Sequence, residues 1–99
     1  MVNLVDEYQR QLRVLDQMLQ ESQSVRARFD VARQTYQSQI NSARNMGYMG
    51  DYVDQLTTRF REFSDLMDQL LLTMLRGEVN IADQEQRLRR AISDAQSTD

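Results

Sequence analysis

The chain has 99 residues, a formal net charge of −3 and twelve basic residues, all of them arginine. Cysteine, histidine, lysine and tryptophan are absent, which excludes disulfides, thiolate or imidazole metal sites, cysteine or histidine catalysis and lysine Schiff-base chemistry. Because phosphate binding depends on a surplus of clustered positive charge, the acidic balance argues against a nucleic-acid partner. We therefore expect no enzymatic activity, no cofactor, no metal ion and no small-molecule substrate.

A long amphipathic helix is expected from about residue 3 to residue 44. Apolar or small side chains recur there at spacings of three, four and seven residues, which is the pattern of one buried helix face. These positions are Leu4, Tyr8, Leu15, Met18, Ser22, Val25, Phe29, Ala32, Tyr36 and Ala43. No apolar stretch of the chain reaches the roughly 18 residues that a spanning helix needs, so no membrane span is expected.

A tight turn is expected next, within the sequence RNMGYMGD at residues 44–51. Gly47 and Gly50 can adopt positive φ without steric cost, so one would end the first helix and the other would open the second. Tyr48 would lie at the tip of the turn. Asp51 is a suitable N-cap for the helix that follows.

A second helix is expected over residues 51–95, with a heptad pattern of the coiled-coil kind. Its apolar positions are Val53, Leu56, Phe60, Phe63, Met67, Leu70, Met74, Ile81, Leu88 and Ala91. Gly77 weakens the helix and Asn80 could cap a separate last helix, so a bend or break is possible over residues 77–80. Since the apolar phase continues from Met74 to Ile81, a continuous helix is favoured.

Two helices of this length joined by a short turn form an antiparallel helical hairpin, and residues 1–99 are expected to make one all-α domain. Folding about Tyr48 would place Tyr36 opposite Phe60 and Ser22 opposite Met74. Gly77 would lie opposite Leu19 and leave room for the leucine side chain. The same register brings Arg33 near Asp65, and Asp6 and Glu7 near Arg89 and Arg90. Such surface ion pairs disfavour slipped registers more than they add stability.

The apolar stripes are wider than a single partner helix can cover. We therefore expect an oligomer, either of this chain alone or with a similar hairpin protein, in which two hairpins form a four-helix bundle. The expected interface consists of Phe29, Tyr36, Phe60, Phe63, Met67, Leu70, Leu71 and Met74.

The whole chain resembles the Trp-x-Gly family of small leaderless proteins of type VII secretion systems, the early-secreted-antigen type. The resemblance rests on the length, the two-helix layout and the aromatic-x-Gly tripeptide Tyr48-Met49-Gly50 at the central turn, followed by Phe60 and Phe63. Tyr48 stands where that family has tryptophan, and no tyrosine follows Tyr52 to make its C-terminal Tyr-x-x-x-Asp/Glu export signal. The resemblance implies a dimeric four-helix bundle without catalytic activity, exported as a folded pair.

Two other classes of function were weighed from the residues. A structural or assembly subunit, or an adaptor, of a phage, a pilus or another secretion apparatus would show the same heptads. An enzyme would need more than the carboxylates of Glu62, Asp65 and Asp68, because bundle metal sites also use histidine.

The N-terminal residues lack the apolar core of a signal peptide. We therefore expect a cytoplasmic protein, with leaderless export or incorporation into a virion or secretion apparatus as alternatives.

Overall fold

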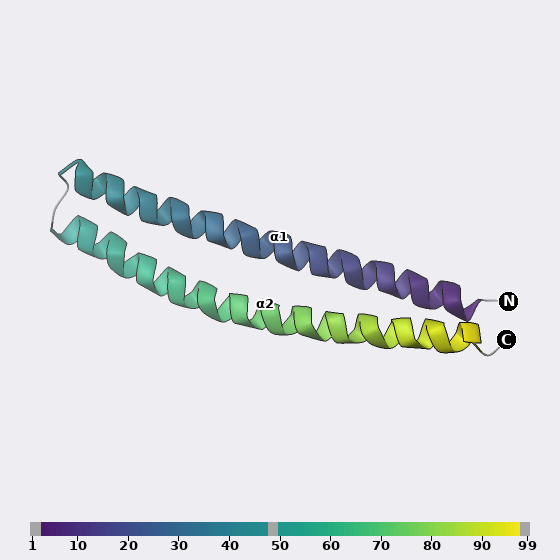
Figure 1. Cartoon of the computed structure of the whole chain (residues 1–99). Coiled ribbons are helices and arrows are strands. Elements are labelled where there is room, and N and C mark those ends of the chain that lie inside the picture. The colour runs from purple at the N-terminus through teal and green to yellow at the C-terminus, as the bar shows by residue number, and fades with distance from the viewer. Residues whose placement is uncertain (1–2, 48–49, 98–99) are drawn as a thin grey trace. The chain divides into compact units, whose positions relative to one another are not determined.

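The protein is all-α in a computed structural model that describes residues 3–47 and 50–97 (Figure 1). Helix α1 spans Leu4–Asn45 and helix α2 spans Asp51–Ser97. The expected all-α fold of two long helices is confirmed, and the expected helix ends lie within two residues of the observed ones, which is the usual uncertainty of frayed termini. Helix α2 is continuous through residues 77–80, so no break occurs there.

Helix α1 begins at a side-chain cap. The Asn3 Oδ1 atom accepts a hydrogen bond of 3.0 Å from the Val5 backbone N–H, and the Asn3 carbonyl accepts one of 3.1 Å from the Glu7 N–H. The first bond satisfies a backbone donor that has no partner within the helix, and the second is the first i→i−4 backbone bond of the helix. Asp6 and Glu7 add negative charge in this turn, where the helix dipole favours it.

The turn between the helices depends on its glycines. Gly47 and Gly50 have φ angles of 84° and 73°, in the left-handed region that disfavours residues with a Cβ atom. Tyr48, expected at the tip, lies outside the described residues. The Gly50 carbonyl accepts the Asp54 N–H at 3.1 Å, the first backbone bond of α2. Gly50 therefore occupies the N-cap position, and the expected N-cap Asp51 is instead the first helical residue.

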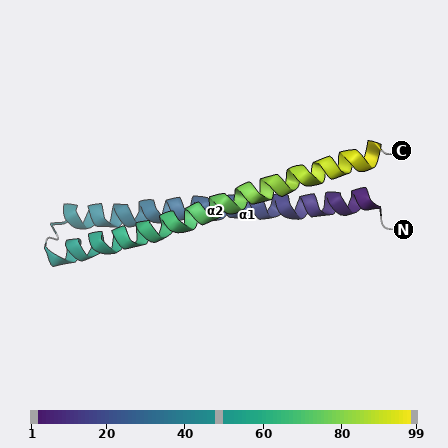
Figure 2. The same cartoon turned by 90° about the horizontal axis from the view of Figure 1, so that it is seen from below.

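The chain divides into two compact units, and each consists of paired segments from both helices. We call residues Val25–Thr73 the turn unit, because they include the turn, and residues Met1–Ser24 with Met74–Asp99 the terminal unit. Within each unit the segments of α1 and α2 run antiparallel (Figures 1 and 2).

The turn unit has an apolar core and an aromatic cluster. Ile40 and Met67 are 1% and 3% exposed, and Ala43 and Val53 are also buried. The Tyr36 ring lies with its centroid 5.5 Å from that of Phe60 and 5.7 Å from that of Phe63, within the range of favourable aromatic pairs. The expected pairing of Tyr36 with Phe60 is thus confirmed.

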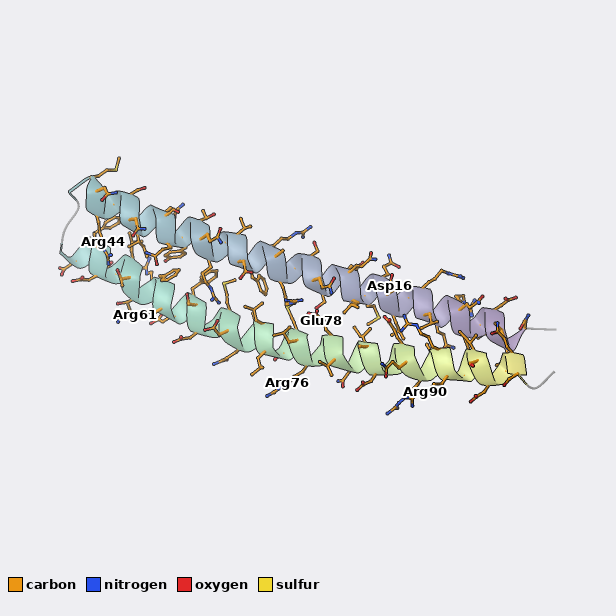
Figure 3. All side chains as sticks on the ribbon, viewed as in Figure 1. Asp16, Arg44, Arg61, Arg76, Glu78 and Arg90 are labelled. Atoms are coloured by element: carbon orange, nitrogen blue, oxygen red, sulfur yellow. The ribbon has the colours of Figure 1, made fainter. Side chains whose placement is uncertain are left out.

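The terminal unit buries acidic side chains between its helices. Glu78 lies on the face of α2 that points toward α1 (Figure 3), where it accepts a hydrogen bond of 3.0 Å from the Ser22 hydroxyl. Ser22 therefore pairs one helical turn beyond its expected partner Met74. Glu85 follows Glu78 by one heptad and is also buried. A buried carboxylate at either position is not expected from the apolar periodicity of the sequence.

Charged pairs near the chain ends form within each helix. Arg10 forms a salt bridge with Glu7 in α1, and Arg89 forms one with Glu85 in α2. These pairs replace the expected pairing of Asp6 and Glu7 with Arg89 and Arg90. The hydrogen bond from Arg10 is the main cause that lowers the pKa of the Glu7 carboxyl. A carboxyl whose pKa is lower in the folded than in the unfolded protein stabilises the fold when the pH is above its unfolded-state pKa. This stabilisation is lost as the pH falls through the folded-state pKa, so the pair favours the fold at neutral pH. The pair is exposed, so salt screens it.

We predict that Gly77→Ala stabilises the protein. Gly77 has helical geometry, and a Cβ atom built there meets nothing within 4 Å, so the expected role of making room for Leu19 is wrong. Alanine in a helix interior is about 1 kcal/mol more favourable than glycine. Urea unfolding should show this gain in the free energy of unfolding, and an unchanged or lower value would contradict the expectation.

We predict the opposite effect for Gly50→Ala. A Cβ atom there also meets nothing within 4 Å, so the effect of the substitution isolates the backbone conformation at a φ of 73°. The left-handed conformation costs an L-residue about 1 kcal/mol or more. The free energy of unfolding should fall by about this amount in the same urea titration, with Gly77→Ala as the matched control.

Candidate functional site

The segment of α2 in the turn unit carries two parallel heptad lines. The first line points toward α1 and consists of Val53, Thr57, Phe60, Ser64, Met67 and Leu71. The second line begins one residue earlier and repeats the same spacing of four and three residues. We call its apolar members the second stripe: Tyr52, Leu56, Phe63, Leu66 and Leu70.

The second stripe is largely open to solvent. Tyr52 and Leu66 are each 56% exposed, and Leu70 is 44% exposed. Leu56 is half-buried, as is Phe63, whose ring stacks against Tyr36. Arg59 occupies the one polar position of this line, between Leu56 and Phe63. A heptad line of aliphatic and aromatic side chains thus lies beside the line that already packs on α1.

Side chains of α1 extend this surface with small, uncharged groups. A hollow in the turn unit is lined by Tyr52 from α2, by Met46 just after the end of α1 and, from α1, by Thr35, Ser38, Gln39, Ser42 and Ala43. None of these side chains carries a charge. Because the distance between packed helices depends on the size of the side chains between them, small residues here permit close approach of another helix.

The opposite flank of the turn unit is polar. Arg33 Nη2 donates to Asp68 Oδ1 at 2.8 Å and to the Ser64 carbonyl at 3.5 Å. Met67 stands between Leu66 and Asp68 in the sequence, and each step along a helix turns 100°, so these neighbours lie on opposite sides of it. Arg44 Nη2 donates to the Thr57 hydroxyl at 3.5 Å on the polar side. The turn unit therefore has one apolar flank and one polar flank.

The eight expected interface residues occupy different places. Met67 belongs to the core of the turn unit, and the Tyr36 ring contacts both Phe60 and Phe63. Leu70 is exposed, whereas Phe29, Leu71 and Met74 are half-buried. Contact of these residues with a partner stays a prediction.

Sequence reasoning missed Tyr52 and Leu66, which are the most exposed members of the second stripe. The heptad pattern expected from the sequence combines residues of both lines. Val53, Phe60 and Met67 belong to the line that points toward α1, whereas Leu56, Phe63 and Leu70 belong to the second stripe. The sequence does contain a signal for this line, because alternating steps of four and three residues from Tyr52 lead to Leu66 and Leu70. Only the packing on α1 shows which of the two lines is the more exposed.

Comparison of the chain with family models, curated proteins and solved structures finds no match. Along residues 3–47 and 50–97, neither helix contains an apolar stretch long enough to cross a membrane. In the same residues, acidic side chains do not gather in groups of three that could hold a metal ion.

The ion pair on the polar flank gives a test of the register. We predict that Arg33 and Asp68 are coupled by about 0.5 kcal/mol in a double-mutant cycle of Arg33→Met and Asp68→Asn, the size typical of partly exposed pairs. The same cycle with Asp65→Asn is the control, because the expected pairing of Arg33 with Asp65 is replaced by the bond to Asp68. Equal coupling for both aspartates would argue against the observed register.

Proposed function

We propose that this protein is a non-enzymatic protein–protein interaction module whose second stripe packs against a second helical hairpin. The observation that carries the proposal is the second stripe itself, with Tyr52, Leu66 and Leu70 about half exposed. Exposed apolar side chains that share one helix face mark interaction sites, whereas singly scattered ones do not. The absence of histidine, cysteine and lysine from the chain supports a function without catalysis.

The surface area supports association. The chain of 11.7 kDa exposes 7728 Å², whereas a compact monomer of this mass exposes about 5,900 Å². The difference, about 1,800 Å² for one chain, is about twice the roughly 800 Å² that each partner buries in a standard protein–protein interface. A partner that covers the second stripe would thus bring the exposed area toward that of a compact protein.

The spacing of the second stripe indicates what kind of partner fits. The line that packs on α1 and the second stripe both alternate steps of four and three residues. Side chains at this spacing interlock with a helix that carries the same repeat. A second copy of this hairpin offers such a surface, and four helices packed in this way form a four-helix bundle.

For the biological role, we propose a dimeric substrate or component of a secretion system. Support comes from the resemblance to the Trp-x-Gly proteins noted above, which the two-helix layout joined at Gly47 and Gly50 fits. Detection of the tagged protein in the culture medium of its native host, with and without the secretion ATPase, tests this role. Equal amounts in the two cultures would refute it.

We predict a dimer at micromolar concentration that Leu66→Glu combined with Leu70→Glu dissociates. Both side chains lie on the second stripe, and burying two carboxylates without partners in the interface should weaken association at least a hundredfold. Sedimentation equilibrium measures the dissociation constant, and circular dichroism checks that the helices remain.

The matched control is Leu72→Glu. Leu72 is 50% exposed, close to the value for Leu70, but two residues along a helix turn it nearly to the opposite side. This variant should dimerise like the unchanged protein. A stable, well-folded monomer of the unchanged chain, or equal weakening by all the variants, would refute the proposal.

A further inference from the structure

The two helices of the turn unit are aligned at a defined level. The Tyr36 ring contacts both Phe60 and Phe63, so Tyr36 lies level with the helical turn between these two residues. The helices are antiparallel and rise by the same distance per residue, so each step along α1 toward the turn corresponds to one step back along α2 (Figures 1 and 2). This alignment determines which residues of α1 and α2 lie side by side on a flank.

On the apolar flank, one line of α1 runs beside the second stripe. The hollow in the turn unit is lined by three exposed residues that follow one another at steps of four and three: Thr35, Gln39 and Ser42. One step back along the same line is Ala32, which is also exposed, and we call these four residues the α1 flank line. Counted from the level of Tyr36, their neighbours on α2 are, in the order from Ala32 to Ser42, Leu66, Phe63, Arg59 and Leu56.

Neighbours at one level of this flank differ in size in a regular way. Ala32 lies beside Leu66 and Ser42 lies beside Leu56, so a small side chain of α1 accompanies a large apolar one of α2. Gln39, the longest side chain of the α1 flank line, lies beside Arg59, the polar position of the α2 line. The flank therefore consists of two unlike columns that complement each other level by level.

Two copies of the chain can face each other by this flank in two symmetric orientations. When the twofold axis runs parallel to the helices, both turns lie at the same end, and α1 of each copy meets α2 of the other at matching levels. When the axis is perpendicular to the helices, the turns lie at opposite ends, and each helix meets its own counterpart.

Side-chain size favours the orientation with both turns at one end. There Leu56 and Leu66 fill the space that small side chains leave, and Arg59 meets an amide rather than an apolar side chain. With the turns at opposite ends, large side chains of α2 meet one another while small ones of α1 do the same, so the two contacts need different interhelical distances. Because protein interiors are close-packed, the arrangement with equal contacts is the more stable one.

We propose that the partner of this hairpin is a second copy of the chain, packed with both turns at the same end, so that the second stripe of each copy covers the α1 flank line of the other. Leu66 then packs on the partner's Ala32, and Arg59 donates to the side-chain oxygen of the partner's Gln39. The inference rests on the proposed function, to which it adds the identity and orientation of the partner.

Cysteine cross-linking of the full-length chain tests this orientation. The chain has no cysteine, so a single substitution gives each copy one thiol, and any disulfide joins two chains. Differently tagged Gln39→Cys and Arg59→Cys chains are mixed, oxidised and analysed by non-reducing electrophoresis. Both positions are exposed and polar, so the fold should persist, which circular dichroism checks. The two tags should appear together in one disulfide-linked dimer, because a disulfide forms only between Cα atoms within about 7 Å.

Two further mixtures are the controls. Arg28→Cys with Arg59→Cys should give at least tenfold less mixed dimer, because Arg28 lies three steps of the line from Gln39, about 16 Å along the axis. Ala32→Cys with Ser42→Cys links α1 to α1, and should give at least tenfold less as well, because only the orientation with turns at opposite ends brings two α1 helices together.

A dimer in sedimentation that links Ala32→Cys to Ser42→Cys, or that fails to link Gln39→Cys to Arg59→Cys, would overturn the inference and leave the proposed association intact. Equal linking of Arg28→Cys and Gln39→Cys to Arg59→Cys would also overturn it, since a fixed register excludes that result. A monomer in sedimentation contradicts the proposed function, and the orientation falls with it.

Discussion

The packing of one heptad line of α2 against α1 is the interaction on which this protein depends. A pair of helices can bury only the side chains that point toward each other, so few positions reach full burial; among the described residues the apolar ones are Ile40, Ala43, Val53 and Met67. Hydrophobic stabilisation is proportional to the area removed from water. The narrow contact between two helices therefore leaves apolar side chains at the surface, and the proposed association rests on these side chains.

The two flanks of the turn unit would give the proposed association a direction. Arg33 spans the helices to reach Asp68 and the Ser64 carbonyl, so one flank is already occupied by a hydrogen-bonded ion pair. The second stripe occupies the other flank, beside uncharged side chains of α1 such as Ser38 and Ser42. A partner helix placed over the polar flank would have to desolvate the ion pair, whereas the apolar flank imposes no such cost. Electrostatics thus favours one docking side over the other.

The terminal unit shows a different compromise between stability and specificity. Glu78 has the Ser22 hydroxyl as a partner in the observed register, and a shift of the helices would bury the carboxylate without it. Buried polar groups of this kind lower stability but penalise wrong alignments more strongly. Glu85 adds the cost without a complete set of partners, since its Oε1 atom is buried and unpaired.

The sequence by itself determined both helices and the turn between them, because these features depend on local properties of the chain. Apolar periodicity predicts the helix bounds to within two residues, and the pair Gly47 and Gly50 marks the positive φ angles that reverse the chain. The pairing of Tyr36 with Phe60 also follows from the hairpin's symmetry.

The tertiary structure alone decided which helix faces meet and with what offset. Residues on neighbouring lines share one spacing, so periodicity cannot tell whether Leu70 or Leu71 points toward α1, and a shift of one turn preserves most apolar contacts. The polar side chains settle the offset through specific bonds: Ser22 meets Glu78 rather than Met74, and Arg33 meets Asp68 rather than Asp65. Such bonds depend on distances between side chains remote in sequence, which only the packed helices bring together.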